Sequence, residues 1–250
     1  MNLFVYLCFG LTPSIIWLLF FLRKDIHPEP KRMVLMIFFY GMIAAVVAAL
    51  AETIIWEGMF RLNLPEDLMS FLYVFFGIAL IEEILKYFAV RKKILSHPEF
   101  DEPVDAMLYM IISALGFAAL ENMLIFLSPD MFLLPLGETL TLASFRFISA
   151  TFFHALSSGL VGYFLALSCL ENEKRSELVF TGLGIATILH GIYNFSIITI
   201  KGNLSFIIPI IILIGLALVV SSGFKKLEKT ASVCLPDLPS ATRRRAGKIK

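Results

Sequence analysis

Charged side chains are scarce in this sequence. Asp, Glu, Lys and Arg make up 16% of its 250 residues, against about 25% in soluble globular domains. Apolar residues account for 58%, and Phe alone occupies 24 positions. This balance excludes a soluble domain, a disordered chain and a collagen-like fibre, and it indicates a helical protein that crosses a membrane several times. The net charge of +1 gives no indication of a nucleic-acid partner.

Cysteine is also rare, and its spacing fits no known site. Cys8, Cys169 and Cys234 form no Cys-x-x-Cys motif, which excludes a zinc ribbon, a thioredoxin-type site and a disulfide scaffold. Three protease signatures are missing as well: His-Glu-x-x-His, a Gly-x-Ser-x-Gly or Ser–Lys arrangement, and a pair of Asp residues inside apolar segments. The sequence therefore does not favour a zinc metalloprotease with the His-Glu-x-x-His helix, a serine protease or an aspartyl protease.

Seven segments are apolar over the length that a spanning helix needs, which is about 20 residues. Pro and acidic residues separate them, as in HPEP at 27–30 and NLPED at 63–67. The expected fold is all-α: a polytopic membrane bundle of about seven transmembrane helices. The predicted spans are roughly 3–22, 33–56, 68–90, 104–127, 140–169, 178–200 and 204–222.

Lys and Arg are distributed unevenly over the segments between the spans. The first, third and fifth connections and the C-terminal segment together carry 17 of them, whereas the second, fourth and sixth connections carry 2. Cytoplasmic loops of membrane proteins hold the excess of basic residues. The pattern predicts an N-terminus outside and a C-terminus in the cytosol. It also predicts a single membrane domain over residues 1–227 and a flexible, basic cytosolic tail over 228–250.

Several ionisable residues lie inside the predicted spans. Each such group near a helix centre costs about 2.5–3.5 kcal/mol on insertion scales, so these side chains are expected to pair and to face the bundle interior. Glu82 and Lys86 are four residues apart and share one helix face. Glu83 points about 100° away from Glu82, and it is expected to find a partner on another helix.

A second group lies towards the outer ends of its spans. Glu121 and Arg146 occupy similar depths, and Asn122 adds an amide beside Glu121. An ion pair between Glu121 and Arg146 would satisfy both charges, since an unpaired charge in a membrane interior is unfavourable. The expected role of this pair is structural.

A third group contains two histidines near the membrane midplane, His154 and His190, with Asn194 one turn beyond His190. A carboxylate beside an imidazole can orient and deprotonate a water molecule. An imidazole with an amide can donate hydrogen bonds to an oxyanion. Together with Glu82 or Glu83, these residues are expected to hydrolyse a carbonyl compound, of which a peptide bond is the obvious candidate. A metal site made by one Glu and two His is a geometric alternative.

These residues belong to four motifs that, in their order along the chain, resemble those of the PrsW family of glutamic-type intramembrane proteases. That family is related to the CAAX prenyl endopeptidases and the bacteriocin-processing membrane proteins. The resemblance covers residues of about 68–200, most of the membrane core. The matching segments are EEILK at 82–86, FAALE at 117–121, Arg146 with His154, and HGIYN at 190–194.

The resemblance implies an endopeptidase of a prokaryotic cell (inner) membrane that needs no metal or other cofactor. Its substrates would be single-pass membrane proteins such as anti-sigma factors, cut near the outer face to begin regulated proteolysis. Glu82 or Glu83 with one His would activate water, and the other His with Asn194 would stabilise the transition state. Because Glu121 stands where the related prenyl endopeptidases have His, His154 is the expected partner of the carboxylate. The expected supporting residues are Lys86, Phe117, Glu121, Asn122 and Arg146.

Two other functions fit parts of the sequence. Intramembrane Glu, Lys, His and Arg also form proton relays, so a proton-coupled transporter is the main alternative. Transporters tend to have internal repeats and broken helices, whereas this sequence has no repeat and its predicted spans are mostly uninterrupted. The third option is an inactive membrane scaffold with the same fold.

Overall fold

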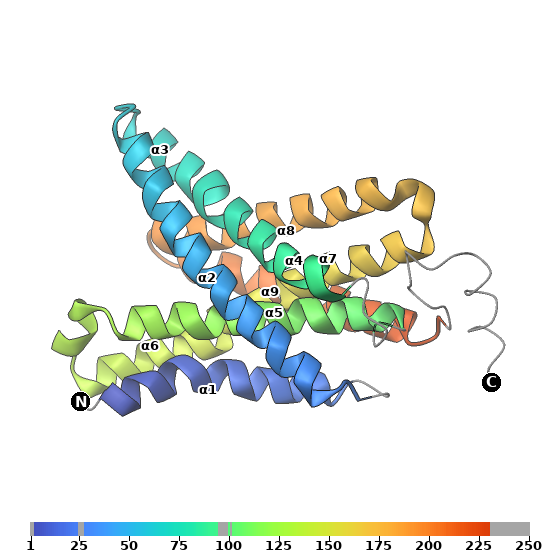
Figure 1. Ribbon diagram of the computed structural model, residues 1–250. Helices are drawn as coiled ribbons and strands as arrows, with labels where there is room; N and C mark the ends of the chain where they lie inside the picture. The colour runs from blue at the N-terminus through green and yellow to red at the C-terminus, as the bar shows by residue number, and fades with distance from the viewer. Residues whose placement is uncertain (1–2, 25–27, 95–99, 101, 231–250) are drawn as a thin grey trace.

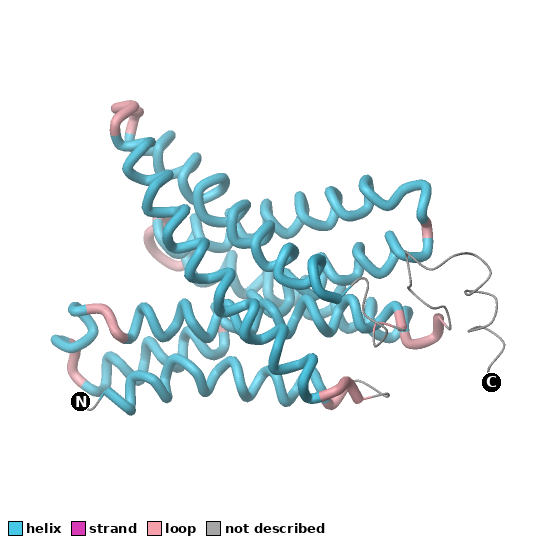
Figure 2. The backbone as a smooth tube through the Cα atoms, in the orientation of Figure 1, coloured by secondary structure: helices cyan, strands magenta, loops and turns pink. Residues whose placement is uncertain are grey.

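The computed structural model describes residues 3–24, 28–94, 100 and 102–230. All regular structure in these residues is helical, and Figure 2 shows how short the connections are. Within these described residues, seven helical stretches are long and apolar enough to cross a membrane, which confirms the expected all-α, seven-span fold. In chain order the helices are α1 (Leu3–Leu22), α2 (Lys31–Phe60), α3 (Glu66–Leu72), the π-helix η1 (Tyr73–Ala79), α4 (Leu80–Ile94), α5 (Pro103–Phe126), the 3₁₀ turn η2 (Pro129–Leu133), α6 (Leu136–Ile148), α7 (Ala150–Leu170), the 3₁₀ turn η3 (Asn172–Lys174), α8 (Arg175–Ile198) and α9 (Leu204–Leu227).

Helices α5 and α7 form the centre of the bundle. Helix α5 packs against α1, α2 and α7, and α7 also packs against α8 and α9 (Figure 1). In the most apolar stretch of α5, 72% of the residues are buried within the protein, whereas only 17% are buried in the corresponding stretch of α9. The outer helices therefore present rows of Ile and Leu to the surroundings, as a protein does when lipid covers its surface.

Two glycines bring α2 and α5 close together. A Cβ atom on Gly41 would lie 1.9 Å from the Ser113 carbonyl oxygen, and one on Gly116 would lie 2.0 Å from the Phe38 carbonyl oxygen. Small residues let transmembrane helices approach to backbone contact. This crossing fixes α2 against α5, and it therefore also fixes the wall that α2 contributes to the polar interior.

We expect Gly116→Ala to destabilise the protein by about 1–3 kcal/mol, the usual range for overpacking a tight interior. The added methyl group has to displace backbone, because the nearest atoms belong to the main chain of Phe38. Thermal unfolding of purified protein measures the change. Gly215→Ala in α9 is the matched control, since nothing lies within 4 Å of its added Cβ. Equal unfolding midpoints for the two variants would contradict the close crossing.

The third span is one helix with a π-helical middle. Helix α3 leads into η1, and η1 leads directly into α4. The backbone N–H of Leu80 donates to the Phe75 carbonyl, five residues earlier. Such segments form their hydrogen bonds over five residues rather than the four of an α-helix, and they are frequent at functional sites. Here the π-helix ends just before Glu82 and Glu83.

The fifth span differs from its prediction as a single helix over 140–169. Helix α6 ends at Ile148 and α7 begins at Ala150, with Ser149 between them at φ −103° and ψ −77°. The Ser149 hydroxyl hydrogen-bonds to the Tyr193 hydroxyl on α8, so a tertiary contact holds the chain where the helix is interrupted. An apolar pattern cannot reveal such a contact. The uninterrupted span that was expected here, and that counted against a transporter, is absent.

The first described helix begins, and the last one ends, at opposite ends of the bundle. Helix α1 starts on the left in Figure 1, and α9 ends on the right. An odd number of spans requires this arrangement. Helix α9 ends at Leu227, and most of the predicted tail, residues 231–250, lies outside the described residues. The division into a membrane domain and a tail stays a prediction.

Candidate active site

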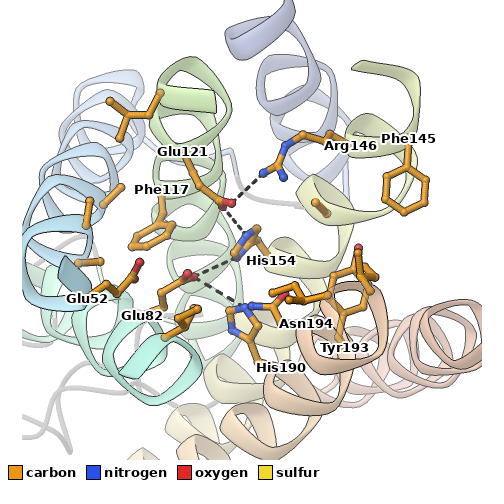
Figure 3. Close-up of a pocket in the computed structure, with 18 of the residues that line it drawn as sticks. Glu52, Glu82, Phe117, Glu121, Phe145, Arg146, His154, His190, Tyr193 and Asn194 are labelled. Carbon is orange, nitrogen blue, oxygen red and sulfur yellow. Dashed lines mark hydrogen bonds and ion pairs between the residues drawn. The ribbon is translucent and has the colours of Figure 1, made fainter. Parts of the chain in front are cut away.

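A pocket of about 340 Å³ lies between α2, the end of η1, the start of α4 and the helices α5 to α8. Its walls combine small apolar side chains of α2 with the polar side chains singled out in the sequence (Figure 3). The polar and aromatic residues around it are Glu52, Glu82, Phe117, Glu121, Phe145, Arg146, His154, His190, Tyr193 and Asn194. The structure thus brings together in one cavity residues from six different helices.

Of the two adjacent carboxylates, Glu82 and Glu83, it is Glu82 that lines the pocket. Its side chain extends from the first turn of α4, and the residue is 5% exposed. The Glu82 Oε2 atom lies 3.8 Å from His154 Nδ1 and 3.8 Å from His190 Nε2. Figure 3 shows both imidazoles facing this carboxylate, with His154 above His190 in the view. Glu82 therefore lies beside both histidines within the pocket.

Glu83 points away from the pocket into the protein, and it has no exposed surface. Its Oε1 atom lies 2.9 Å from His190 Nδ1, 3.0 Å from the Ser157 hydroxyl and 3.0 Å from Lys86 Nζ. An ionised carboxylate only accepts hydrogen bonds, so His190 Nδ1 carries the proton in this contact. The lone pair of a neutral His190 is then on Nε2, on the side of Glu82. Glu83 in this way orients the second histidine.

Both ring nitrogens of His154 already have close neighbours. Nδ1 lies 2.9 Å from Lys86 Nζ, and Nε2 lies 2.8 Å from Glu121 Oε2. An ammonium group only donates hydrogen bonds, so Nδ1 accepts and the ring proton belongs on Nε2, facing the carboxylate. His154 is held in place from both sides and has no free nitrogen for a reacting molecule.

Lys86 is fully buried at the base of this group. Its ammonium lies 2.9 Å from Glu82 Oε2, 3.0 Å from Glu83 Oε1 and 2.9 Å from His154 Nδ1. The same nitrogen is 4.4 Å from the centre of the Phe117 ring, a favourable position for a cation. All three N–H groups of the ammonium thus have an acceptor.

The expected ion pair between Glu121 and Arg146 is present. Arg146 Nη2 lies 2.8 Å from Glu121 Oε1, and Arg146 Nε donates to Asn122 Oδ1. The Asn122 amide nitrogen in turn donates to the Thr151 hydroxyl at 3.0 Å. This chain of contacts joins α5 to α6 and α7 across the break at Ser149. Through Glu121 it also reaches His154.

Asn194 lies on the pocket wall one turn beyond His190, as its spacing predicted. Its amide makes no hydrogen bond to the described part of the chain, which leaves it able to donate to a bound molecule. Tyr193, beside it, lines the pocket while its hydroxyl meets Ser149.

Sequence reasoning missed two residues of this site. Glu52 on α2 lines the pocket opposite the histidines, and a lone acidic residue within an otherwise apolar span could have identified it. Ser157 on α7 donates to Glu83, and a single Ser in an apolar span gives no indication of such a contact. Its role depends on how α7 and α4 face each other, which no local pattern records.

Comparison with known proteins gives independent evidence of the family to which this chain belongs. A family profile described as "PrsW family intramembrane metalloprotease" matches residues 29–221. Among similar curated proteins, Protease PrsW of Bacillus subtilis is 26% identical over 92% of this chain and 98% of its own length. Protease PrsW of Oceanobacillus iheyensis is 30% identical over 79% and 83%, and that of Geobacillus kaustophilus is 29% identical over 74% and 76%. No solved structure matches the chain significantly.

Proposed function

Because this chain belongs to the PrsW family of intramembrane proteases, we propose that it hydrolyses a peptide bond of a membrane-protein substrate with Glu82 as the base. The single observation that carries this proposal is the position of Glu82 in the pocket, 3.8 Å from both histidines. Seven apolar helices make it a multi-pass integral membrane protein. We propose that it lies in the cell membrane of a bacterium, because the relatives that it resembles are bacterial proteins.

Glu82 and His190 can orient one water molecule between them. Their facing atoms are 3.8 Å apart, so a single water about 2.8 Å from each can donate one hydrogen to the carboxylate and the other to His190 Nε2. Both hydrogens are then engaged, and a lone pair of the water oxygen is free to attack a carbonyl carbon. Glu82 takes the proton that the water loses and returns it to the amine that leaves.

This assignment favours His190 over His154, which the sequence resemblance had suggested as the water-activating histidine. The reason is that both nitrogens of His154 have other neighbours. His154 instead keeps Glu82 from turning away and connects it to Glu121. The free amide of Asn194 is placed to donate to the developing oxyanion, and loss of one such donor typically slows the reaction by about 10²–10³-fold.

The name of the family implies a catalytic metal ion. Glu82, His154 and His190 offer ligand atoms within 4.8 Å of one another, and one Glu with two His is a known zinc-binding set. However, Lys86 Nζ lies 2.9 Å from Glu82 Oε2 and 2.9 Å from His154 Nδ1. A cationic group is therefore within hydrogen-bond distance of two of the three candidate ligands. These residues do not fit a metal as they are arranged, and the proposed reaction uses only the acid and base groups of the protein.

We further propose that the substrate is a single-pass membrane protein of the anti-sigma type, cut in the outer half of the membrane. The support is the family resemblance together with the pocket wall, which includes Glu121, Arg146 and Asn194 from the predicted outer parts of their helices. The small side chains Ala45, Ala48 and Ala49 on the α2 wall leave room for a peptide backbone. Cleavage there would begin regulated proteolysis.

The deciding experiment uses purified full-length protein in lipid vesicles with a panel of single-span substrates. We expect cleavage within or near the outer half of a substrate span, unchanged by a chelator such as EDTA. Mass spectrometry of the products locates the cut. A transporter would give a different result: no fragment from any substrate, and a proton flux that depends on the buried carboxylates. Cleavage that stops on chelation would contradict the proposed metal-free reaction.

The proposed orientation places the N-terminus outside and the connection between α7 and α8 in the cytosol. Basic residues in that connection, Lys174 and Arg175, motivate the assignment. We expect a reporter that works only in the cytosol to be active when it is fused after residue 174. The same reporter should be inactive when it is fused after residue 133, in the connection without Lys or Arg, where a reporter that works only outside the cell should be active. The same side for both reporters would contradict seven spans with this orientation.

A further inference from the structure

The Lys86 ammonium contacts two of the three groups that a metal ion would need here. The three candidate ligand atoms of Glu82, His154 and His190 lie within 4.8 Å of one another. The Lys86 nitrogen is 2.9 Å from the ligand atoms of Glu82 and His154, and both accept hydrogen bonds from it. A metal ion binds through the same lone pairs. The ion and the ammonium therefore compete for the same two atoms.

Lys86 is also held in this position more firmly than a lysine usually is. It has no exposed surface, and its ammonium has three acceptors, the third being Glu83 Oε1 at 3.0 Å. Phe117 closes the remaining side, 4.4 Å from the nitrogen. Because Glu82, Glu83 and Lys86 lie within two turns of one helix, their spacing does not depend on movements between helices. Long basic side chains in membranes normally extend towards water, and this one does not.

We propose that Lys86 is the resident cation of this site: it holds Glu82, Glu83 and His154 together and keeps a latent Glu/His/His metal site closed. The single positive charge neutralises one of two adjacent carboxylates, so a divalent ion entering beside it would meet a like charge in a medium that screens poorly. Removal of the ammonium opens the site, because two carboxylates and two imidazoles then remain without their cation. This inference concerns metal binding and does not depend on the proposed proteolytic reaction.

The test is metal binding by the full-length protein in detergent, without substrate. Cobalt(II) is titrated and followed by its visible absorption, and zinc content is measured after dialysis. Lys86→Met keeps the length of the side chain and removes its charge. We expect Lys86→Met to bind one Co²⁺ per chain about 10–100-fold more tightly than the wild type, the range over which groups beside metal ligands change affinity. The bands should be those of a four-coordinate ion.

Two controls make the result specific. Lys226→Met removes a lysine at the end of α9 that donates to the Tyr163 hydroxyl, and it should bind cobalt like the wild type. Adding Glu82→Gln to Lys86→Met should abolish the gained binding, since it removes one of the three ligands. If Lys86→Met unfolds, the double variant Lys86→Met/Glu83→Gln has one carboxylate fewer to neutralise and keeps all three ligands.

The wild type tests the proposal without any variant. Purified wild-type protein that retains one zinc ion per chain through dialysis would overturn it, and protein without bound metal supports it. Folded Lys86 variants that bind cobalt no better than the wild type would also overturn it. Failure to find a cleaved substrate would count against the proposed function alone, because the titration contains no substrate.

Discussion

Glu82→Gln is expected to slow substrate cleavage by at least about 10³-fold, within the range attributed to a general base. Glutamine keeps the shape of the side chain, and its oxygen can still accept from Lys86, which lies 2.9 Å away. It cannot take a proton from water. The fold should therefore survive while turnover is lost, and the comparison is made by product formation over time together with the unfolding midpoint of the same sample.

The adjacent Glu83→Gln is the closest available comparison for this prediction. Glu83 is fully buried and binds His190, Ser157 and Lys86 rather than lining the pocket. We expect a larger loss of stability and a smaller loss of rate than in Glu82→Gln, because the change acts through the orientation of His190. Glu82→Gln combined with His190→Ala should be little slower than Glu82→Gln alone, since members of one catalytic unit are not additive. A Glu82→Gln enzyme with near wild-type rate would show that the base lies elsewhere.

Arg146→Ala is expected to lower stability by about 3 kcal/mol, the lower end of the range for breaking a buried pair. The lower end applies because the Glu121 side chain retains 30% exposure to the pocket. The substitution leaves Glu121 without its cation and Asn122 without the guanidinium that its carbonyl accepts. For a chain of this size the change corresponds to a drop of about 6–12 °C in the unfolding midpoint, and the yield of folded protein should also fall.

A double substitution separates the ion pair from simple loss of packing. In Arg146→Ala with Glu121→Gln, the uncompensated charge is gone, so part of the stability should return. Arg146→Lys keeps a charge but loses the forked contact to both Glu121 and Asn122, and it should fall between the wild type and Arg146→Ala. An unfolding midpoint in Arg146→Ala equal to that of the wild type would mean that the pair contributes nothing measurable.

The sequence contained enough information for the number of spans and for contacts within one helix. Glu82 and Lys86 could be paired by their spacing alone, and they are paired in the structure. The ion pair of Glu121 with Arg146 could be expected from depth, because few partners exist for a charge at that level of the membrane. Each of these inferences needs only the position of a residue along its own helix.

Contacts that depend on how helices rotate against each other could not be predicted. Glu83 meets His190 and Ser157 because α4, α7 and α8 turn those faces inward. Hydropathy gives no rotation angle for a membrane helix, because its lipid-facing side and its buried side are both apolar. The engagement of both nitrogens of His154 is of the same kind. The break at Ser149 depends on Tyr193, a residue 44 positions away. The fold was therefore more predictable than the division of roles within the site.

The π-helix η1 determines how the third span can tolerate changes in its length. One extra residue in a helix is accommodated locally as a π-helical turn while the flanking turns keep their facing. Deletion of one residue within Tyr73–Ala79 can therefore return this segment to α-helix. The side chains of Glu82, Glu83 and Lys86 then keep their present direction towards the interior of the bundle. Deletion of one residue between Leu80 and Glu82 would rotate all three side chains by about 100° relative to α3. Over evolutionary time, insertions and deletions in this span are thus expected to gather in η1.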